Sequence, residues 1–295
     1  MRLDRLLWGA VPLLLLACGN ATSTDDCAGD EGCACYPNST CNGALSCFSN
    51  LCVNAGGVSG FGGAGNGGAT ARGGAPAFSA PAKDPAIWYR ADQGVVESSS
   101  NVSAWRDQSG NGADATATDT SRQPFLVPNA VNGLPVLRFY GGQSLYLSTP
   151  FSASTFTVFV AGKNSMPGEN YSIFLGPGGN TPNNQLRWED STSIMIVGLG
   201  NDLPQTVFPF GTTRVYHIVS VRYDGEVLDV ARNGVPVGSS RFVTSGPWEL
   251  GQVGAWFSTY FMQGDLAEMV LYNRRLGDAD FAGTAGYLRE KYAIQ

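Results

Sequence analysis

The sequence is poor in charge. Only 14% of its 295 residues are Asp, Glu, Lys or Arg, against about a quarter in an average soluble protein. There are three lysines, one histidine and, after position 52, no cysteine. So little charge excludes coiled coils, helical bundles and charge-rich disordered chains. The net charge of −6 also argues against nucleic acid as a partner, because phosphate binding depends on clustered Lys and Arg.

Glycine and cysteine are plentiful but unevenly placed. All seven cysteines lie between positions 18 and 52, and many of the 39 glycines crowd into residues 55–82. The composition therefore predicts four regions: a leader at 1–17, a cysteine-rich module at 18–54, a glycine-rich linker at 55–82 and a folded domain at 83–295. Gly, Ala, Ser and Asn in the linker predict a flexible tether with a reach of roughly 30 Å.

The leader has the order of a secretory signal peptide. Arg2 and Arg5 precede an apolar run over residues 6–17, which is too short to span a bilayer. Its end, Leu15-Leu16-Ala17-Cys18, resembles a bacterial lipobox. The resemblance implies that Cys18 is lipidated, that the membrane is a partner through this anchor, and that the protein is an exported outer-membrane lipoprotein facing the periplasm or the cell surface. An ordinary cleaved signal peptide is the alternative.

Six further cysteines follow Cys18 at close spacing. An even set in an exported chain predicts three disulfides, and a segment this short needs such cross-links to hold a fold. A zinc site is the weaker alternative, because no Cys-x2-Cys pair and no nearby histidine occur. The spacing does not select a connectivity among Cys27, Cys33, Cys35, Cys41, Cys47 and Cys52.

Residues 83–295 carry the pattern of an all-β fold. Apolar residues alternate with others over 156–161 and 215–223, as expected for strands with two different faces. Asp224-Gly225 and Asn233-Gly234 separate apolar runs and predict tight hairpins. About a dozen short strands predict two packed antiparallel sheets. One helix is predicted after Gly277, with Asp278 as its N-cap and one apolar face of Phe281, Ala285, Leu288 and Tyr292.

Four motifs of this domain carry a family resemblance. They are Ile87-Trp88-Tyr89-Arg90-Ala91, the stretch from Val102 to Ala115 around Trp105-Arg106-Asp107-Gln108-Ser109-Gly110-Asn111-Gly112, the stretch Asn132-Gly133-Leu134-Pro135-Val136-Leu137-Arg138-Phe139, and the ending from Gly264 to Leu276. Together they resemble the laminin-G-like, concanavalin A-like domains of bacterial surface proteins. The resemblance implies a two-sheet antiparallel jelly-roll sandwich with a short C-terminal helix. It also implies binding of glycans or proteins, sometimes through calcium, although glycoside hydrolases share the sandwich.

The residues offer no catalytic pattern. The single histidine, His217, lies in mid-strand, and no Gly-x-Ser-x-Gly elbow accompanies it. A glycoside hydrolase needs two carboxylates on one face, but Asp265 and Glu268 are three positions apart, so strand alternation places them on opposite faces. The sequence therefore predicts no catalytic residue and a protein that is not an enzyme.

Two groups are candidates for binding. Trp256, Phe257 and Tyr260 precede the last strand in an expected rim loop, where aromatic rings stack on sugars; the alternative is that they cap the core, as Trp188 and Trp248 are expected to do. Asp107, Asn111 and Asp114 offer oxygen ligands for a structural Ca²⁺, although such residues also build turns.

These features predict a lipid-anchored, non-catalytic protein whose domain binds carbohydrate or an extracellular polymer. The alternatives are a glycoside hydrolase or polysaccharide lyase on the same sandwich, or a protein-binding adhesion component.

Overall fold

A computed structural model describes residues 36, 40, 42, 46–48, 51–53, 80–166, 171–178, 184–198, 205–244, 246–257 and 260–295. The chain divides into two compact units, Met1–Ala71 and Arg72–Gln295. In the first unit, β1 (Ser46–Phe48) and β2 (Leu51–Val53) form an antiparallel pair in which Cys47 lies opposite Cys52. The leader, Cys18 and four of the other cysteines, Cys27, Cys33, Cys35 and Cys41, lie outside the described residues.

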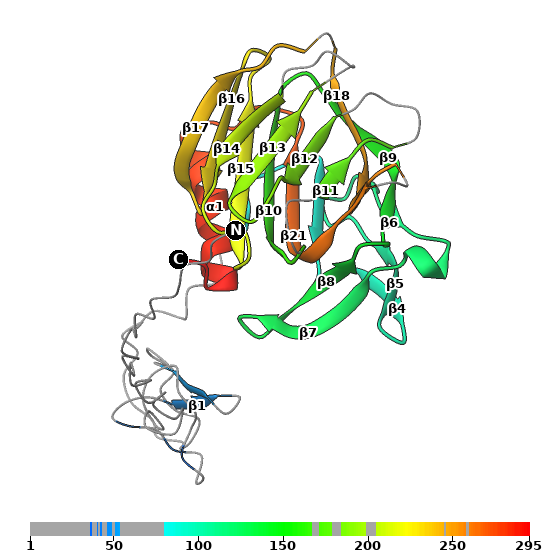
Figure 1. Cartoon of the computed structure of the whole chain (residues 1–295), viewed down its shortest axis with the longest axis vertical. Coiled ribbons are helices and arrows are strands. Elements are labelled where there is room, and N and C mark those ends of the chain that lie inside the picture. Colours follow the sequence, from blue (N-terminus) through cyan, green and yellow to red (C-terminus); the bar gives the residue numbers. More distant parts are fainter. Residues whose placement is uncertain are drawn as a thin grey trace, which may run out of the picture. The chain divides into compact units, whose positions relative to one another are not determined.

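The second unit is an antiparallel all-β sandwich, as predicted (Figure 1). Hydrogen bonding runs through 17 strands that form two facing layers. The first layer contains β3 (Ile87–Arg90), β7 (Phe125–Val131), β8 (Leu134–Tyr140), β10 (Phe156–Asn164), β15 (His217–Tyr223), β16 (Val227–Arg232), β17 (Val235–Arg241) and β21 (Gln263–Tyr272). The second contains β4 (Val95–Ser98), β5 (Asn101–Trp105), β6 (Ala115–Thr116), β9 (Leu145–Ala153), β11 (Ser172–Gly176), β12 (Gln185–Trp188), β13 (Ser193–Val197), β14 (Gln205–Pro209) and β18 (Trp248–Val253).

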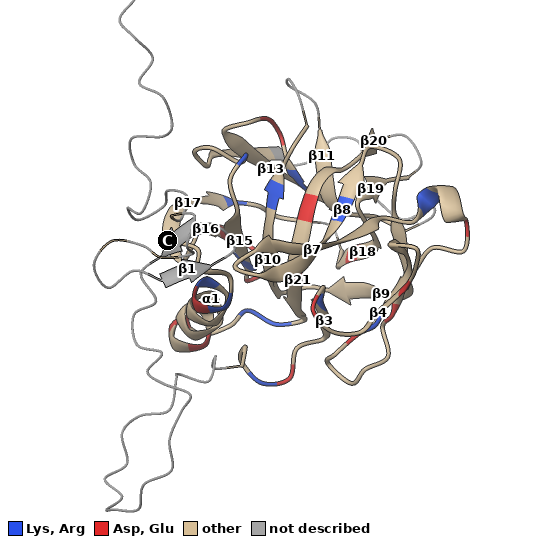
Figure 2. Ribbon diagram, turned by 90° about the horizontal axis from the view of Figure 1, so that it is seen from below, with Lys and Arg blue, Asp and Glu red and all other residues tan. Residues whose placement is uncertain are grey.

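Strand alternation divides the buried residues into two clusters. On β10, Val158 and Val160 join the core between the layers, whereas Phe159 and Ala161 join a second cluster. The first core also holds Trp188 and Trp248, as predicted, and both are fully buried. The second cluster forms because helix α1 (Asp278–Tyr292) covers the outer face of the first layer. Figure 2 shows α1 on the side of β10 and β21 away from β11 and β13.

The N-cap of helix α1 lies one residue before the predicted one. Gly277 is the N-cap and makes no side-chain capping bond, so the prediction of Asp278 as N-cap is wrong. The Asp278 carboxylate instead accepts a 2.6 Å hydrogen bond from Arg222 on β15. Ala285, Leu288 and Tyr292 are buried, as the apolar periodicity predicts. Within the described part of the chain, no helix combines the length and apolarity that crossing a membrane requires.

A β-bulge corrects the prediction for the two carboxylates of β21. Ala161 of β10 lies opposite Glu268, but its neighbour Gly162 lies opposite Leu266, so Ala267 is an extra residue. One extra residue shifts the alternation by one step. Asp265 and Glu268 therefore share the outer face of the first layer, where both side chains are fully buried.

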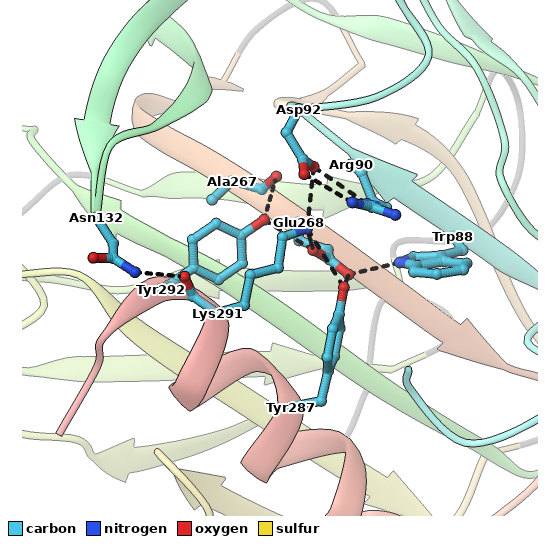
Figure 3. A network of polar contacts seen from close by, with 9 residues as sticks. All are labelled: Trp88, Arg90, Asp92, Asn132, Ala267, Glu268, Tyr287, Lys291 and Tyr292. Atoms are coloured by element: carbon cyan, nitrogen blue, oxygen red, sulfur yellow. Dashed lines mark hydrogen bonds and ion pairs between the residues drawn. The ribbon is translucent and has the colours of Figure 1, made fainter. Parts of the chain in front are cut away.

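Glu268 is the centre of a polar network that fastens α1 to the sheet (Figure 3). Oε1 accepts hydrogen bonds from Trp88 Nε1 at 2.6 Å and Tyr287 at 2.9 Å. Oε2 accepts from Lys291 Nζ at 2.6 Å and Tyr292 at 2.8 Å. Burial, followed by the nearby Glu268 charge, raises the pKa of both tyrosines, which keeps them protonated as donors. We call Glu268 and these four donors the Glu268 network; it explains why a short helix is held firmly.

Candidate functional site

The structure brings the three predicted aromatic residues together on the second layer. Trp256 lies in β19 (Ala255–Trp256), which pairs with β20 (Tyr260–Phe261). The ring centroid of Trp256 is 5.1 Å from that of Tyr260 and 5.2 Å from that of Phe257. These are distances at which aromatic rings attract one another. The side chains predicted to bind ligand therefore form one group.

Two residues that the sequence reasoning missed extend this group. Tyr171 lies 5.6 Å from Tyr260, ring centroid to centroid. Arg187 of β12 places its guanidinium 3.8 Å from the centre of the Tyr171 ring, a cation–π contact. We call Tyr171, Arg187, Trp256, Phe257 and Tyr260 the aromatic face. The pattern Gln185-Leu186-Arg187 in a buried strand is a signal that could have located it, because an arginine among buried strand residues needs partners.

Strand register places Arg187 on the outer side of the second layer. It lies opposite Ile173 on β11 and Met195 on β13, while its neighbours Leu186 and Trp188 enter the core. Its Nε donates to Glu189 at 2.7 Å and its Nη1 to Gln185 at 2.9 Å. The guanidinium is thus held rigidly beneath Tyr171, with a carboxylate and an amide beside it.

The aromatic face combines exposed rings with buried, unpaired polar groups. Tyr171 and Tyr260 are each 39% exposed. Gln252 is fully buried, yet neither atom of its amide has a hydrogen-bond partner in the described chain. Gln252 lies opposite Gly176, and a Cβ on Gly176 would come within 2.2 Å of the Ala255 carbonyl oxygen. The segment carrying Trp256 therefore passes directly over the strand position next to Gln252.

Unpaired amides of this kind are costly. A buried polar group without a partner loses roughly 1–3 kcal/mol. Asn184, just before β12, is also fully buried with both amide atoms unpaired in the described chain, as is the indole Nε1 of Trp256. Trp105 Nε1 and Trp248 Nε1 in the core are unpaired in the described chain as well, so an unpaired buried atom does not by itself mark a ligand surface.

The predicted calcium ligands build a turn. The Asp107 carboxylate accepts from the backbone amides of Trp88 and Ser109, both at 2.9 Å. Asp114 accepts from the Asp107 amide at 2.9 Å and from Arg106, and Asn111 donates to Pro85 and Ala86. Burial favours a higher pKa for Asp114, but the hydrogen bonds from Arg106 and the Asp107 amide, with the Arg106 charge, together outweigh it and lower the pKa. Among the described residues, no three His, Cys, Asp or Glu side chains cluster for a metal; calcium binding at Asp107, Asn111 and Asp114 stays a prediction.

His217 has a structural place. It is fully buried, its Nε2 accepts from Trp188 Nε1 at 2.9 Å, and its Nδ1 lies 2.8 Å from the Val215 carbonyl oxygen. Burial lowers the pKa of His217 to about 4, so it is neutral near pH 7. Both ring nitrogens are engaged inside the core, beneath the strand that carries Arg187.

Solved structures match this fold. No protein-family model and no curated protein sequence matches the chain. A sialidase from Trypanosoma rangeli, in complex with sialic acid, shares 15% identity at a TM-score of 0.50, over 72% of this chain and 34% of the sialidase. Domain 4 of AbnA, a GH43 extracellular arabinanase from Geobacillus stearothermophilus, in complex with arabinotriose, shares 14% identity at a TM-score of 0.50, over 68% of this chain and 98% of that domain.

These likenesses are to the fold, and this chain spans about a third of the sialidase. They nevertheless bear on the predicted absence of activity. Both structures come from enzymes, a sialidase and an arabinanase. The prediction that the chain is not an enzyme is therefore contradicted, because a sandwich fold does not by itself exclude catalysis.

Proposed function

We propose that the domain of residues 83–295 binds carbohydrate on the aromatic face, as part of a protein that acts on glycans. The observation that carries the proposal is the contact series from Arg187 through Tyr171 and Tyr260 to Trp256. Partly exposed rings offer flat apolar surfaces to the C–H faces of sugars. Arg187 and Glu189, whose side chains are 10% and 20% exposed, would supply hydrogen bonds to hydroxyl groups.

The comparisons support this choice at the level of the fold. Both neighbouring structures contain a bound sugar, sialic acid in one and arabinotriose in the other. The laminin-G-like, concanavalin A-like assignment of this domain is likewise part of the proposal.

Hydrolysis of the bound glycan is the second candidate. Glu189 lies on the same face, with its side chain 20% exposed and its Oε2 held by Arg187. A carboxylate ordered beside a sugar-stacking surface suits an acid or base role in glycoside cleavage.

The proposal also includes export as a lipoprotein anchored through Cys18. Disulfides would cross-link residues 18–54, and residues 55–82 would form a flexible tether. Such an arrangement would display the domain to polymers outside the inner membrane. It follows from the sequence pattern alone.

Titration of the full chain with a panel of neutral oligosaccharides, including arabinotriose, tests carbohydrate binding. We expect Tyr260→Ala to weaken binding about fivefold, because one ring contact contributes about 1 kcal/mol. Val235→Ala is the control, since Val235 is a 65% exposed apolar side chain on the other layer. Equal affinities for both variants would remove the aromatic face from the site.

Release of reducing sugar tests the second candidate in the same samples. Glu189→Gln should abolish release while binding persists. Unchanged release in that variant would exclude Glu189 as the reacting carboxylate.

A further inference from the structure

A hollow lies where β8, β10 and β21 meet. Its volume is about 370 Å³. Its lining is made by Arg138, Phe139, Tyr140, Lys163, Ser165, Gln263 and Gly264. The two charged side chains of this lining are both cations, and both are partly exposed: Arg138 by 30% and Lys163 by 25%.

Asp265 holds these cations in place from below. It lies directly opposite Arg138 on one side of β21 and opposite Lys163 on the other. Arg138 donates Nε and Nη2 to its two carboxylate oxygens at 2.7 and 2.9 Å, and Tyr216 donates to Oδ2 at 2.5 Å. Lys163 Nζ stands 3.4 Å from Oδ2. Asp265 itself is fully buried and does not line the hollow.

The hollow therefore carries an excess of positive charge. Two cations meet one carboxylate, and the bidentate Arg138 pair already satisfies that carboxylate. The Asp265 hydrogen bond raises the pKa of Arg138. Burial favours a higher pKa for Asp265, but the hydrogen bonds from Arg138 and Tyr216 and the charges of Arg138 and Lys163 together outweigh it and lower the pKa. Lys163 is thus the surplus cation of the lining, and its Nζ also lies 4.7 Å from the centre of the Tyr216 ring.

The backbone connects this hollow to the aromatic face where β11 and β21 begin, with Arg138 and Lys163 on the outer face of the first layer and Arg187 on that of the second. Gln263 lines it, and the Gln263 backbone amide and carbonyl oxygen both bond the Ser172 hydroxyl, at 3.1 and 3.2 Å. Ser172 follows Tyr171 directly, and Tyr260 precedes Gln263 by three residues. Tyr140, opposite Gln263 on β8, is 60% exposed at the rim. An aromatic ring thus stands beside the cations as well.

We propose that the hollow binds the carboxylate of an acidic sugar unit belonging to the glycan that stacks on the aromatic face. The inference rests on the proposed function. Arg138 and Lys163 supply charge-assisted hydrogen bonds to an anion, and Tyr140 supplies a stacking edge. The preferred ligand class is a uronic-acid-containing polysaccharide.

Binding of trigalacturonate to the full chain, compared with arabinotriose, tests the proposal. We expect Lys163→Gln to weaken trigalacturonate binding about tenfold, as loss of one charge-assisted hydrogen bond implies, and to leave arabinotriose unchanged. Arg241→Gln removes the same charge from a side chain that is 76% exposed on β17 and should change neither. We substitute Lys163 and not Arg138, because loss of Lys163 leaves the Arg138–Asp265 pair intact. Tyr140→Ala is a second variant, which we also expect to weaken the binding of trigalacturonate and not that of arabinotriose.

Three results would overturn the proposal: no trigalacturonate binding, equal affinities for Lys163→Gln and Arg241→Gln, or competition by sodium acetate at concentrations where the trisaccharide itself binds. Tyr260→Ala separates this outcome from failure of the proposed function. Loss of arabinotriose binding in Tyr260→Ala with no effect of Lys163→Gln keeps the aromatic face and rejects the hollow. The reverse pattern keeps the hollow and rejects the aromatic face.

Discussion

The Glu268 network and the aromatic face differ in whether their buried polar groups have hydrogen-bond partners. In the network, each oxygen of a fully buried carboxylate accepts two hydrogen bonds, and α1 covers the group. On the aromatic face, the fully buried amide of Gln252 has no partner in the described chain, and the rings beside it are partly exposed. Complete pairing beneath α1 indicates a structural role, whereas the partly exposed rings indicate a surface for a ligand.

The difference follows from what each region must do. A carboxylate beneath a helix loses its water permanently, so the chain has to replace every hydrogen bond. A ligand-binding surface must keep donors and acceptors available, at a cost in stability. The two regions should therefore respond to substitution with opposite signs.

Breaking the Glu268 network should have the largest effect. Lys291→Met leaves the buried Glu268 charge without its cation, and the free energy of unfolding should fall by about 3–5 kcal/mol. Denaturant unfolding of the full chain measures it. Lys83→Met is the matched control, because Lys83 is exposed and surface changes stay within about 0.5 kcal/mol.

Adding Glu268→Gln to Lys291→Met should recover part of that loss, because the glutamine is neutral. A loss in Lys291→Met no larger than in Lys83→Met would mean that the network does not hold α1 in place.

Acid should have an effect of intermediate size on the free energy of unfolding, through the buried His217 in the core. His217 has a pKa of about 4 in the folded chain and about 6.5 when unfolded. Between these values the unfolded state binds a proton that the folded state does not, so stability falls as pH falls. We expect a loss of about 2 kcal/mol from pH 6.5 to 5, measured by denaturant unfolding at each pH.

His217→Gln should flatten the curve in that window, since His217 is the single histidine of the chain. The pairing of Asp92 with Arg90 and Lys291 responds at lower pH: burial favours a higher pKa for Asp92, but its bonds to and the charges of Arg90 and Lys291 together outweigh this and lower the pKa. The contribution of this pairing is therefore lost only below Asp92's ordinary value of 3.8. An equal slope in His217→Gln and the parent chain would contradict a neutral, buried His217.

Removing the unpaired amide should produce the smallest change, and of opposite sign. Gln252→Met fills a similar volume without unpaired atoms, so the free energy of unfolding should rise by about 1 kcal/mol. Oligosaccharide binding should not change, because the amide is fully buried. Thermal unfolding and ligand titration of one sample measure both.

Gln123→Met is the control for that change, because buried Gln123 donates its amide to the Ala117 carbonyl oxygen at 3.1 Å and its loss should destabilise. Destabilisation of similar size in both variants would show that Gln252 is paired in solution.

Much of the fold could be predicted from local pattern. The hairpin at Asn233-Gly234, the strand alternation of β10 and the apolar face of α1 depend on neighbours within a few residues. The bulge at Ala267 could not be predicted, because an extra residue in β21 is visible only against the register of β10. The same reason hid the shared face of Asp265 and Glu268.

The candidate site, too, could be predicted only in part. The ring-rich segment of Trp256, Phe257 and Tyr260 is contiguous enough to be identified from residue types alone. Tyr171 and Arg187 join it from other strands, and no spacing along the chain connects them.

The sequence by itself determined an all-β domain, the placement of its turns and one amphipathic closing helix, because hairpins and periodicity are short-range properties of the backbone. Only the tertiary structure decided which polar groups are paired and which face a ligand. Pairing depends on strands brought together from distant parts of the chain, as when Asp265 meets both Arg138 and Lys163, and burial then decides whether a charge is neutralised or left available.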